Sequence, residues 1–129
     1  MTRRNNRYAT ASQVMHHGYD PKECLIEVTP SDDMVASTEK YGLLTTERII
    51  AQIDANKDRL AVVMLAGVQY LTGQMFDMEA ITAHVHKVNA SLPDGEHIYI
   101  GWDLAHAVGN VPLKLHQWGA DFAAFCSYK

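Results

Sequence analysis

The sequence has few of the features that mark secreted, membrane-bound or nucleic-acid-binding proteins. Its two cysteines, Cys24 and Cys126, are too few for a disulfide framework and too far apart for a C-x-x-C motif. No run of about 18 apolar residues could span a bilayer, and no apolar signal segment opens the chain. A formal net charge of -4 provides no basic stripe for nucleic acid. We therefore expect a cytoplasmic protein with reduced thiols that binds neither membranes nor nucleic acids.

The seven histidines do not have the spacing of a metal site. His84 and His86 are two residues apart on a predicted helix, so they point to different faces, and the adjacent His16 and His17 diverge as well. We expect no bound metal.

The chain has 47% hydrophobic and 20% charged residues over 129 positions, which suits one globular domain with a buried core. An apolar run at residues 59–67 is typical of a strand covered on both faces. Helical periodicity and apolar runs alternate along the chain, with helices predicted at 9–18, 45–57 and 77–90 and strands at 24–30, 59–67, 97–103 and 121–127. This alternation predicts an α/β fold, a mostly parallel sheet flanked by helices.

Polar residues that follow apolar strands are site candidates, because ligands of open α/β sheets gather at the carboxyl ends of the strands. Asp103 ends the strand "HIYIGWD", and His106 lies three residues further on. Two plainer interpretations stay open: Asp103 caps a short helix at 104–110, and His106 is a core histidine. The connection at 68–77 could present backbone donors to a ligand or be an ordinary loop with Asp77 as an N-cap.

Lys129 follows the apolar strand predicted at 121–127. Such a lysine is often simply solvated. Next to a buried carboxylate, however, desolvation would favour the neutral amine, which is a nucleophile able to form a Schiff base.

Several stretches resemble the kynureninases, pyridoxal 5'-phosphate enzymes of the aspartate-aminotransferase-like (fold type I) superfamily. The resemblance runs from about residue 7 to residue 129, and "GWDLAHAVGNVPLKLHQWGADFA" and "CSYK" are its most specific parts. Many fold type I enzymes share a sparser pattern that is met here by Asp103, His106, Asp121, Ser127 and Lys129.

The resemblance implies a role for each matching residue. Lys129 and Asp103 match the catalytic pair, the lysine that forms a Schiff base with the cofactor and the carboxylate that keeps the pyridine nitrogen protonated. His106 matches a cofactor-contacting histidine, and Tyr128 a tyrosine that contacts the cofactor phosphate. Ala66 stands where some relatives have a cofactor-contacting serine, so one hydrogen bond is expected to be absent.

The implied activity is hydrolysis of L-kynurenine to anthranilate and L-alanine, and of 3-hydroxykynurenine to 3-hydroxyanthranilate, in tryptophan catabolism towards NAD. The implied assembly is a homodimer. Kynureninases are much longer on both sides, and "TRRNN" replaces their Phe-Pro-Ser-Asp motif. We therefore expect residues 1–129 to be part of a large cofactor-binding domain and the isolated chain to be inactive. Two alternatives stay open: another fold type I lyase, such as a cysteine desulfurase, and a non-catalytic truncated chain.

Overall fold

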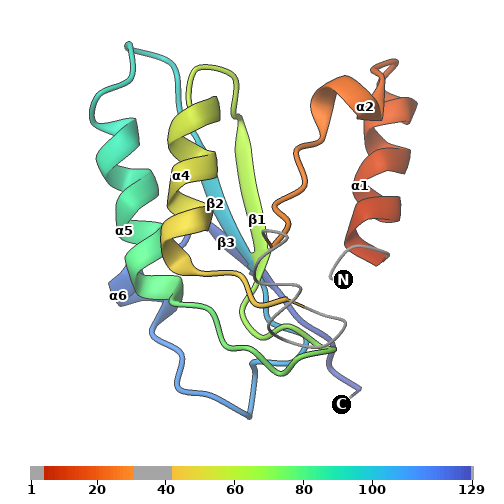
Figure 1. The fold of residues 1–129 in the computed structure, drawn as a ribbon, viewed down its shortest axis with the longest axis vertical. Coiled ribbons are helices and arrows are strands. Elements are labelled where there is room, and N and C mark those ends of the chain that lie inside the picture. The colour runs from red at the N-terminus through yellow and green to blue at the C-terminus, as the bar shows by residue number, and fades with distance from the viewer. Residues whose placement is uncertain (1–4, 31–41, 129) are drawn as a thin grey trace.

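A parallel three-stranded sheet forms the centre of the computed structural model, which describes residues 5–30 and 42–128 (Figure 1). The strands are β1 (Val62–Ala66), β2 (Tyr99–Asp103) and β3 (Phe122–Ala124), in the order β1-β2-β3. Val62 pairs with Tyr99 at one end of the β1–β2 ladder, and Ala66 with Asp103 at the other. The predicted α/β class and the parallel sheet are confirmed.

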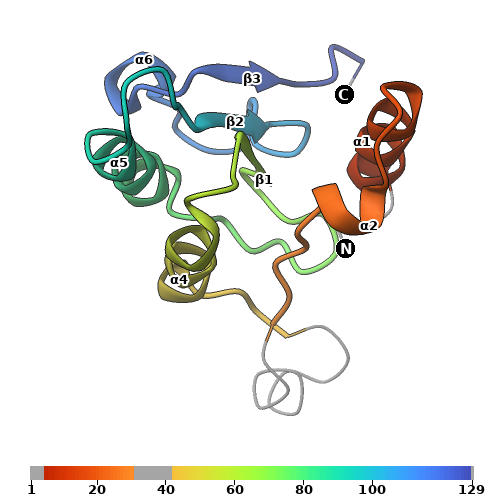
Figure 2. The ribbon, with the colours of Figure 1, turned by 90° about the horizontal axis from the view of Figure 1, so that it is seen from above.

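Two amphipathic helices cover one face of this sheet (Figure 2). Helix α4 (Thr46–Asn56) begins at the N-cap Thr45, whose hydroxyl accepts a hydrogen bond from the Arg48 N–H, and it buries Ile49 and Ile53. Helix α5 (Met78–Asn89) begins at Asp77, whose carboxylate accepts from the Ala80 N–H. The buried residues of α4, α5, β1 and β2 form the core, and the Trp102 side chain lies fully inside it.

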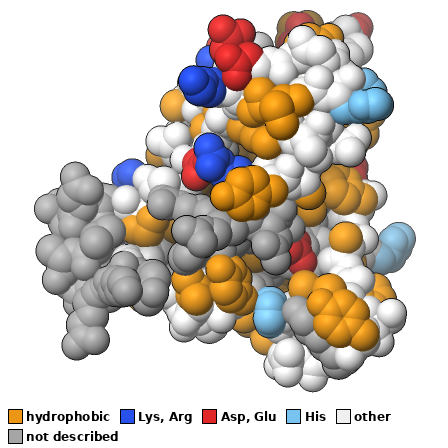
Figure 3. All heavy atoms as spheres, turned by 90° about the vertical axis from the view of Figure 1, so that its right-hand side faces the viewer, with side chains coloured by type: hydrophobic (Ala, Val, Ile, Leu, Met, Phe, Trp, Pro, Cys, Tyr) orange, Lys and Arg blue, Asp and Glu red, His pale blue; other side chains and the backbone are white. Residues whose placement is uncertain are grey.

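The opposite face of the sheet is apolar and exposed among the described residues. Val62, Met64, Tyr99 and Phe122 are 50%, 41%, 52% and 41% exposed, while Val63 and Ile100 are buried, as expected for side chains that alternate across a strand. The expectation that residues 59–67 form a strand covered on both faces is therefore wrong for the described part of the protein. Figure 3, viewed from the side of α1 and α2, shows several hydrophobic side chains at the surface.

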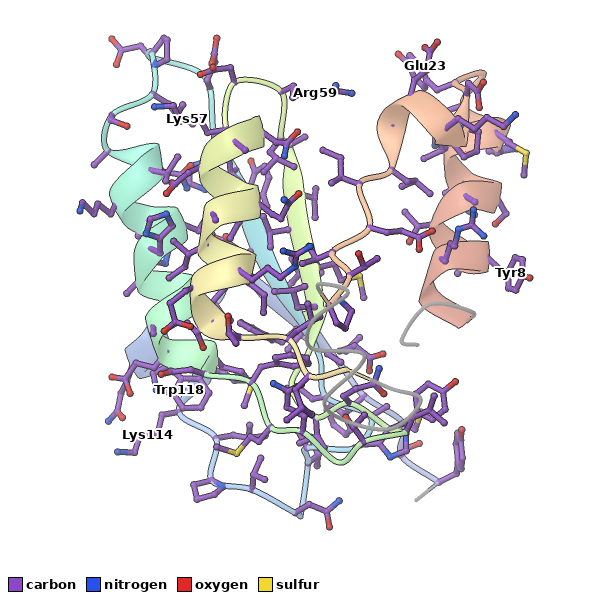
Figure 4. The ribbon with its side chains drawn as sticks, in the orientation of Figure 1. Tyr8, Glu23, Lys57, Arg59, Lys114 and Trp118 are labelled. Atoms are coloured by element: carbon purple, nitrogen blue, oxygen red, sulfur yellow. The ribbon has the colours of Figure 1, made fainter. Side chains whose placement is uncertain are left out.

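The N-terminal helices α1 (Asn5–His16) and α2 (Pro21–Cys24) lie on the side of the sheet opposite α4 and α5 (Figures 1 and 2). A turn with Gly18 at φ 83° follows α1, as expected for a glycine that ends a helix. Arg59, next to β1, reaches towards α2, and its guanidinium donates to the Glu23 carbonyl at 2.7 Å (Figure 4).

A strand was expected at residues 24–30, and this prediction is wrong, because Cys24 ends α2 and residues 25–30 form no strand. The backbone is extended at Leu25, but no described neighbouring strand pairs with this segment, and a strand requires a ladder partner. Side chains hold it instead. The Arg48 Nε–H donates to the Thr29 carbonyl at 2.5 Å, and Arg7 pairs with Glu27.

Helix α6 (Leu115–Trp118) completes the described elements and packs against α5 shortly before β3. Within residues 5–30 and 42–128, no helix is both long and apolar enough to cross a membrane.

Candidate functional site

The carboxyl ends of the strands bring two of the predicted site residues, Ala66 and Asp103, to one edge of the sheet. Ala66 ends β1 and is the register partner of Asp103, which ends β2, and Asp103 is in turn the partner of Ala124 at the end of β3. Backbone hydrogen bonds continue past these ends, from the Gly67 N–H to the Asp103 carbonyl at 2.9 Å and from the Leu104 N–H to the Ala124 carbonyl at 2.7 Å. The connections that follow the strands therefore leave the sheet side by side.

Asp103 is a half-buried carboxylate. Its neighbours in the chain, Trp102 and Leu104, have fully buried side chains. Its Oδ1 accepts a hydrogen bond from the Ala105 N–H at 3.0 Å, which starts a turn. Residues 104–110 form successive turns, in which the Ala107 N–H donates to the Leu104 carbonyl. The interpretation in which Asp103 caps a short helix at 104–110 is therefore wrong as to the helix, although Asp103 does cap the turns that stand in its place.

His106 lies in this turn segment, and its side chain is exposed rather than part of the core. Its ring stacks on Tyr70, with ring centroids 6.1 Å apart and an interplanar angle of 26°. Tyr70 belongs to the connection after β1, where the Gln69 side chain accepts from the Leu71 N–H. The Tyr70–His106 pair therefore joins the connection after β1 to the one after β2.

Tyr128 follows β3 and is 81% exposed. A hydrogen bond with Cys126 raises the pKa of the Tyr128 phenol above its ordinary value, and the charge of the Cys126 thiolate adds to the rise. Lys129, the predicted Schiff-base residue, lies outside the described residues, and so does its position relative to Asp103.

Two contacts around the site were not apparent from the sequence. Tyr70 faces His106 from a position 36 residues away in the chain, and Gln74 binds the Leu44 backbone through both ends of its amide. Gln74 thereby holds the connection after β1 against the start of the α4 segment. Neither residue has a local signal in the sequence, because each contact depends on how the elements pack.

The residues at and after these strand ends offer a carboxylate, an imidazole and a phenol. The Asp103 carboxylate can accept hydrogen bonds, and the His106 ring and the Tyr128 hydroxyl can each donate or accept one. The Ala66 methyl group has no hydrogen bond to offer. No group of three or more His, Cys, Asp or Glu side chains in the described part of the chain could hold a metal ion.

Residues 28–129 match the model of the aminotransferase class-V family, and the chain belongs to that family. Over 125 residues it is 44% identical to the kynureninase of Coccidioides immitis and 47% identical to kynureninase 2 of Chaetomium globosum. The kynureninase of Vanderwaltozyma polyspora is 44% identical over 122 residues. These alignments cover 97%, 97% and 95% of this chain but only 23%, 22% and 24% of the respective relatives, so the chain spans less than a quarter of their length.

Proposed function

We propose that this polypeptide is part of a kynureninase that hydrolyses L-kynurenine to anthranilate and L-alanine, and 3-hydroxykynurenine to 3-hydroxyanthranilate. The observation that carries the proposal is the half-buried Asp103 at the end of β2, within a chain 41–47% identical to proteins named kynureninase. The aminotransferase class-V family and the kynureninases depend on pyridoxal 5'-phosphate, so we propose this cofactor for the site at the strand ends.

We assign the roles at this site by the chemistry of each side chain. Asp103 would pair with the pyridine nitrogen and keep it protonated, since its carboxylate is held by the Ala105 N–H and partly shielded from water. His106 would contact the cofactor ring from the turn after β2, and Tyr128 would donate a hydrogen bond to the phosphate. Ala66 would border the cofactor without bonding to it.

When bound, pyridoxal 5'-phosphate supplies an electron sink for the carbanion formed at the α-carbon of the substrate. Lys129 would attach the cofactor through its side-chain amine and then act as the base that removes the α-proton. A neutral amine is both a nucleophile and a base, so one side chain can fill both roles. Water added to the γ-carbonyl would then allow the Cβ–Cγ bond to break, so that the γ-carbon leaves as the carboxylate of anthranilate and the β-carbon takes up a proton to become the methyl group of L-alanine.

The domain assignment follows from the length of the relatives. Because the chain spans less than a quarter of each relative, we propose that residues 1–129 form part of the large cofactor-binding domain. The exposed apolar face of the sheet supports this assignment, since a sheet of parallel strands is usually covered on both faces. The whole enzyme is proposed to be a cytoplasmic homodimer, and the isolated 129-residue chain is proposed to be inactive.

The test is anthranilate release, followed by its fluorescence, from purified protein supplied with pyridoxal 5'-phosphate and L-kynurenine. The full-length enzyme of which residues 1–129 are proposed to be part is expected to release anthranilate. The 129-residue chain alone is expected to release none. Sulfide release from L-cysteine without anthranilate would replace the proposal with a cysteine desulfurase. Anthranilate from the 129-residue chain would refute the proposed domain role.

A further inference from the structure

The Asp121 residue makes two hydrogen bonds to one residue of the neighbouring strand. Its Oδ2 accepts from the Ile100 N–H at 2.7 Å, and its own N–H donates to the Ile100 carbonyl at 3.0 Å. We propose that Asp121 is a positioning residue of the candidate site, which sets the register of β3 and thereby the place of the segment that carries Tyr128. This role rests on the kynureninase function proposed above.

The Asp121 carboxylate is the acceptor that the structure shows for the Ile100 N–H, at the point where β3 has not yet begun. Ile100 is completely buried, and its N–H points towards β3, since the N–H of the preceding Tyr99 donates to Ala61 on the β1 side. Strand β3 begins only at Phe122, opposite Gly101. A buried backbone donor without an acceptor is costly, so the carboxylate takes the place of a strand carbonyl.

A second contact supports the same register. Phe122 lies against Gly101, so closely that a Cβ atom built on Gly101 would stand 2.1 Å from the Phe122 ring. A shift of β3 by one residue would move the ring off this glycine and separate Asp121 from Ile100. It would also turn every β3 side chain to the other face of the sheet.

The corner before β3 delivers Asp121 to this position. Helix α6 ends at Gly119 in the left-handed region, with φ 76°, and the N–H groups of Gly119 and Ala120 return to the Leu115 carbonyl. The Gly119 carbonyl lies 2.8 Å from His86 Nε2 on α5. Because a carbonyl only accepts, this nitrogen of His86 carries the proton, and the corner is fixed to the helix layer.

The register of β3 has a direct consequence at the site edge. It makes Ala124 the partner of Asp103, and the 2.7 Å hydrogen bond from Leu104 to Ala124 joins the two connections there. Tyr128 follows Ala124 by four residues. A slip of one residue moves a strand by about 3.3 Å, which is enough to carry Tyr128 out of reach of a group bound beside Asp103.

The experiment compares Asp121→Ala, Asp121→Asn and Asp54→Ala in the full-length enzyme of which residues 1–129 are proposed to be part. Asn keeps a carbonyl oxygen for the Ile100 N–H. Asp54→Ala is the matched control for lost stability, since Asp54 on α4 contacts His84 on α5 through an equally short 2.7 Å bond. Amide hydrogen exchange of the β2 segment is measured without cofactor, and kcat and KM for L-kynurenine are measured with it.

Asp121→Ala is expected to speed exchange at Ile100 by about tenfold or more, because the buried N–H loses its acceptor. The same change is expected to lower kcat by about 100-fold with a smaller change in KM, as for a misplaced group near the reaction centre. Asp121→Asn should restore both quantities to within about threefold, and Asp54→Ala should leave kcat unchanged.

The outcomes separate this role from the function on which it rests. If the unchanged protein releases no anthranilate, the proposed function fails and the role of Asp121 fails with it. If the unchanged protein is active and Asp121→Ala keeps its kcat, the function stands and the positioning role is refuted. Unchanged exchange at Ile100 in Asp121→Ala would also refute it.

Discussion

Ala66 and Asp103 face each other across the last rung of the β1–β2 ladder, and the Gly67 N–H donates to the Asp103 carbonyl just beyond it. This pairing places a methyl group next to the carboxylate that we assign to the cofactor nitrogen. The Ala66 side chain is buried, so a group added to it would meet Asp103 and whatever is bound beside Asp103 rather than solvent.

Ala66→Ser is expected to tighten the binding of pyridoxal 5'-phosphate by about five- to tenfold, because the added hydroxyl supplies one hydrogen bond. Titration of the cofactor absorbance gives the dissociation constant. Ala66→Val adds bulk without a hydroxyl and serves as the control. Equal affinity of the Ser variant and the unchanged protein would place Ala66 away from the cofactor.

Asp103→Asn is expected to lower kcat by about 100-fold or more while the fold is retained, because a neutral amide no longer stabilises a positive charge on the ring nitrogen. The Ala105 N–H keeps an acceptor in this variant, since an amide oxygen replaces Oδ1. Steady-state anthranilate release measures the effect. Asp77→Asn is the matched control, because Asn caps the start of α5 as well as Asp does. Near-normal turnover in Asp103→Asn would refute the role of Asp103.

Local patterns in the sequence were sufficient to predict β1, β2 and the two helices, α4 and α5, that cover one face of the sheet. Asp77 is the N-cap of α5, as one interpretation of the sequence indicates, because capping depends on residues within one helical turn. The apolar runs at 59–67 and 97–103 contain β1 and β2, and the position of Asp103 at a strand end follows directly.

The failures of sequence prediction lie where structure depends on distant partners. Residues 25–30 have a strand-like composition, yet their polar groups meet Arg48 and Arg7 instead of a ladder. The Tyr70–His106 and Asp121–Ile100 contacts join residues more than 20 positions apart. No local periodicity encodes such pairs, so only the packed fold identifies them.

Thr82→Val is expected to destabilise the fold by about 1–3 kcal/mol, because it removes the acceptor of a buried donor. The Trp102 Nε1–H donates to the Thr82 hydroxyl at 3.0 Å, and both side chains are completely buried. The shift of the urea unfolding midpoint against the unchanged polypeptide measures this cost. Thr82→Ser keeps the hydroxyl and loses only a methyl group, so it should cost less. A Val variant as stable as the Ser variant would contradict the importance of this bond.

Cys126→Ala is expected to lower the pKa of Tyr128 towards that of a free tyrosine, because it removes the hydrogen bond and the thiolate charge that raise this pKa. Absorbance of the phenolate against pH, taken as the difference from Tyr128→Phe, follows the titration. A raised pKa means that the folded state holds the phenol proton more tightly than the unfolded chain does. The stabilisation is therefore present below pH about 10 and is lost as the pH rises through the folded-state pKa.

Cys24→Ala is the control for this titration, since Cys24 lies on α2 and not beside Tyr128 in the chain. It should leave the Tyr128 titration where it is in the unchanged protein. A Tyr128 titration that is the same in Cys126→Ala and Cys24→Ala would show that Cys126 does not control this phenol.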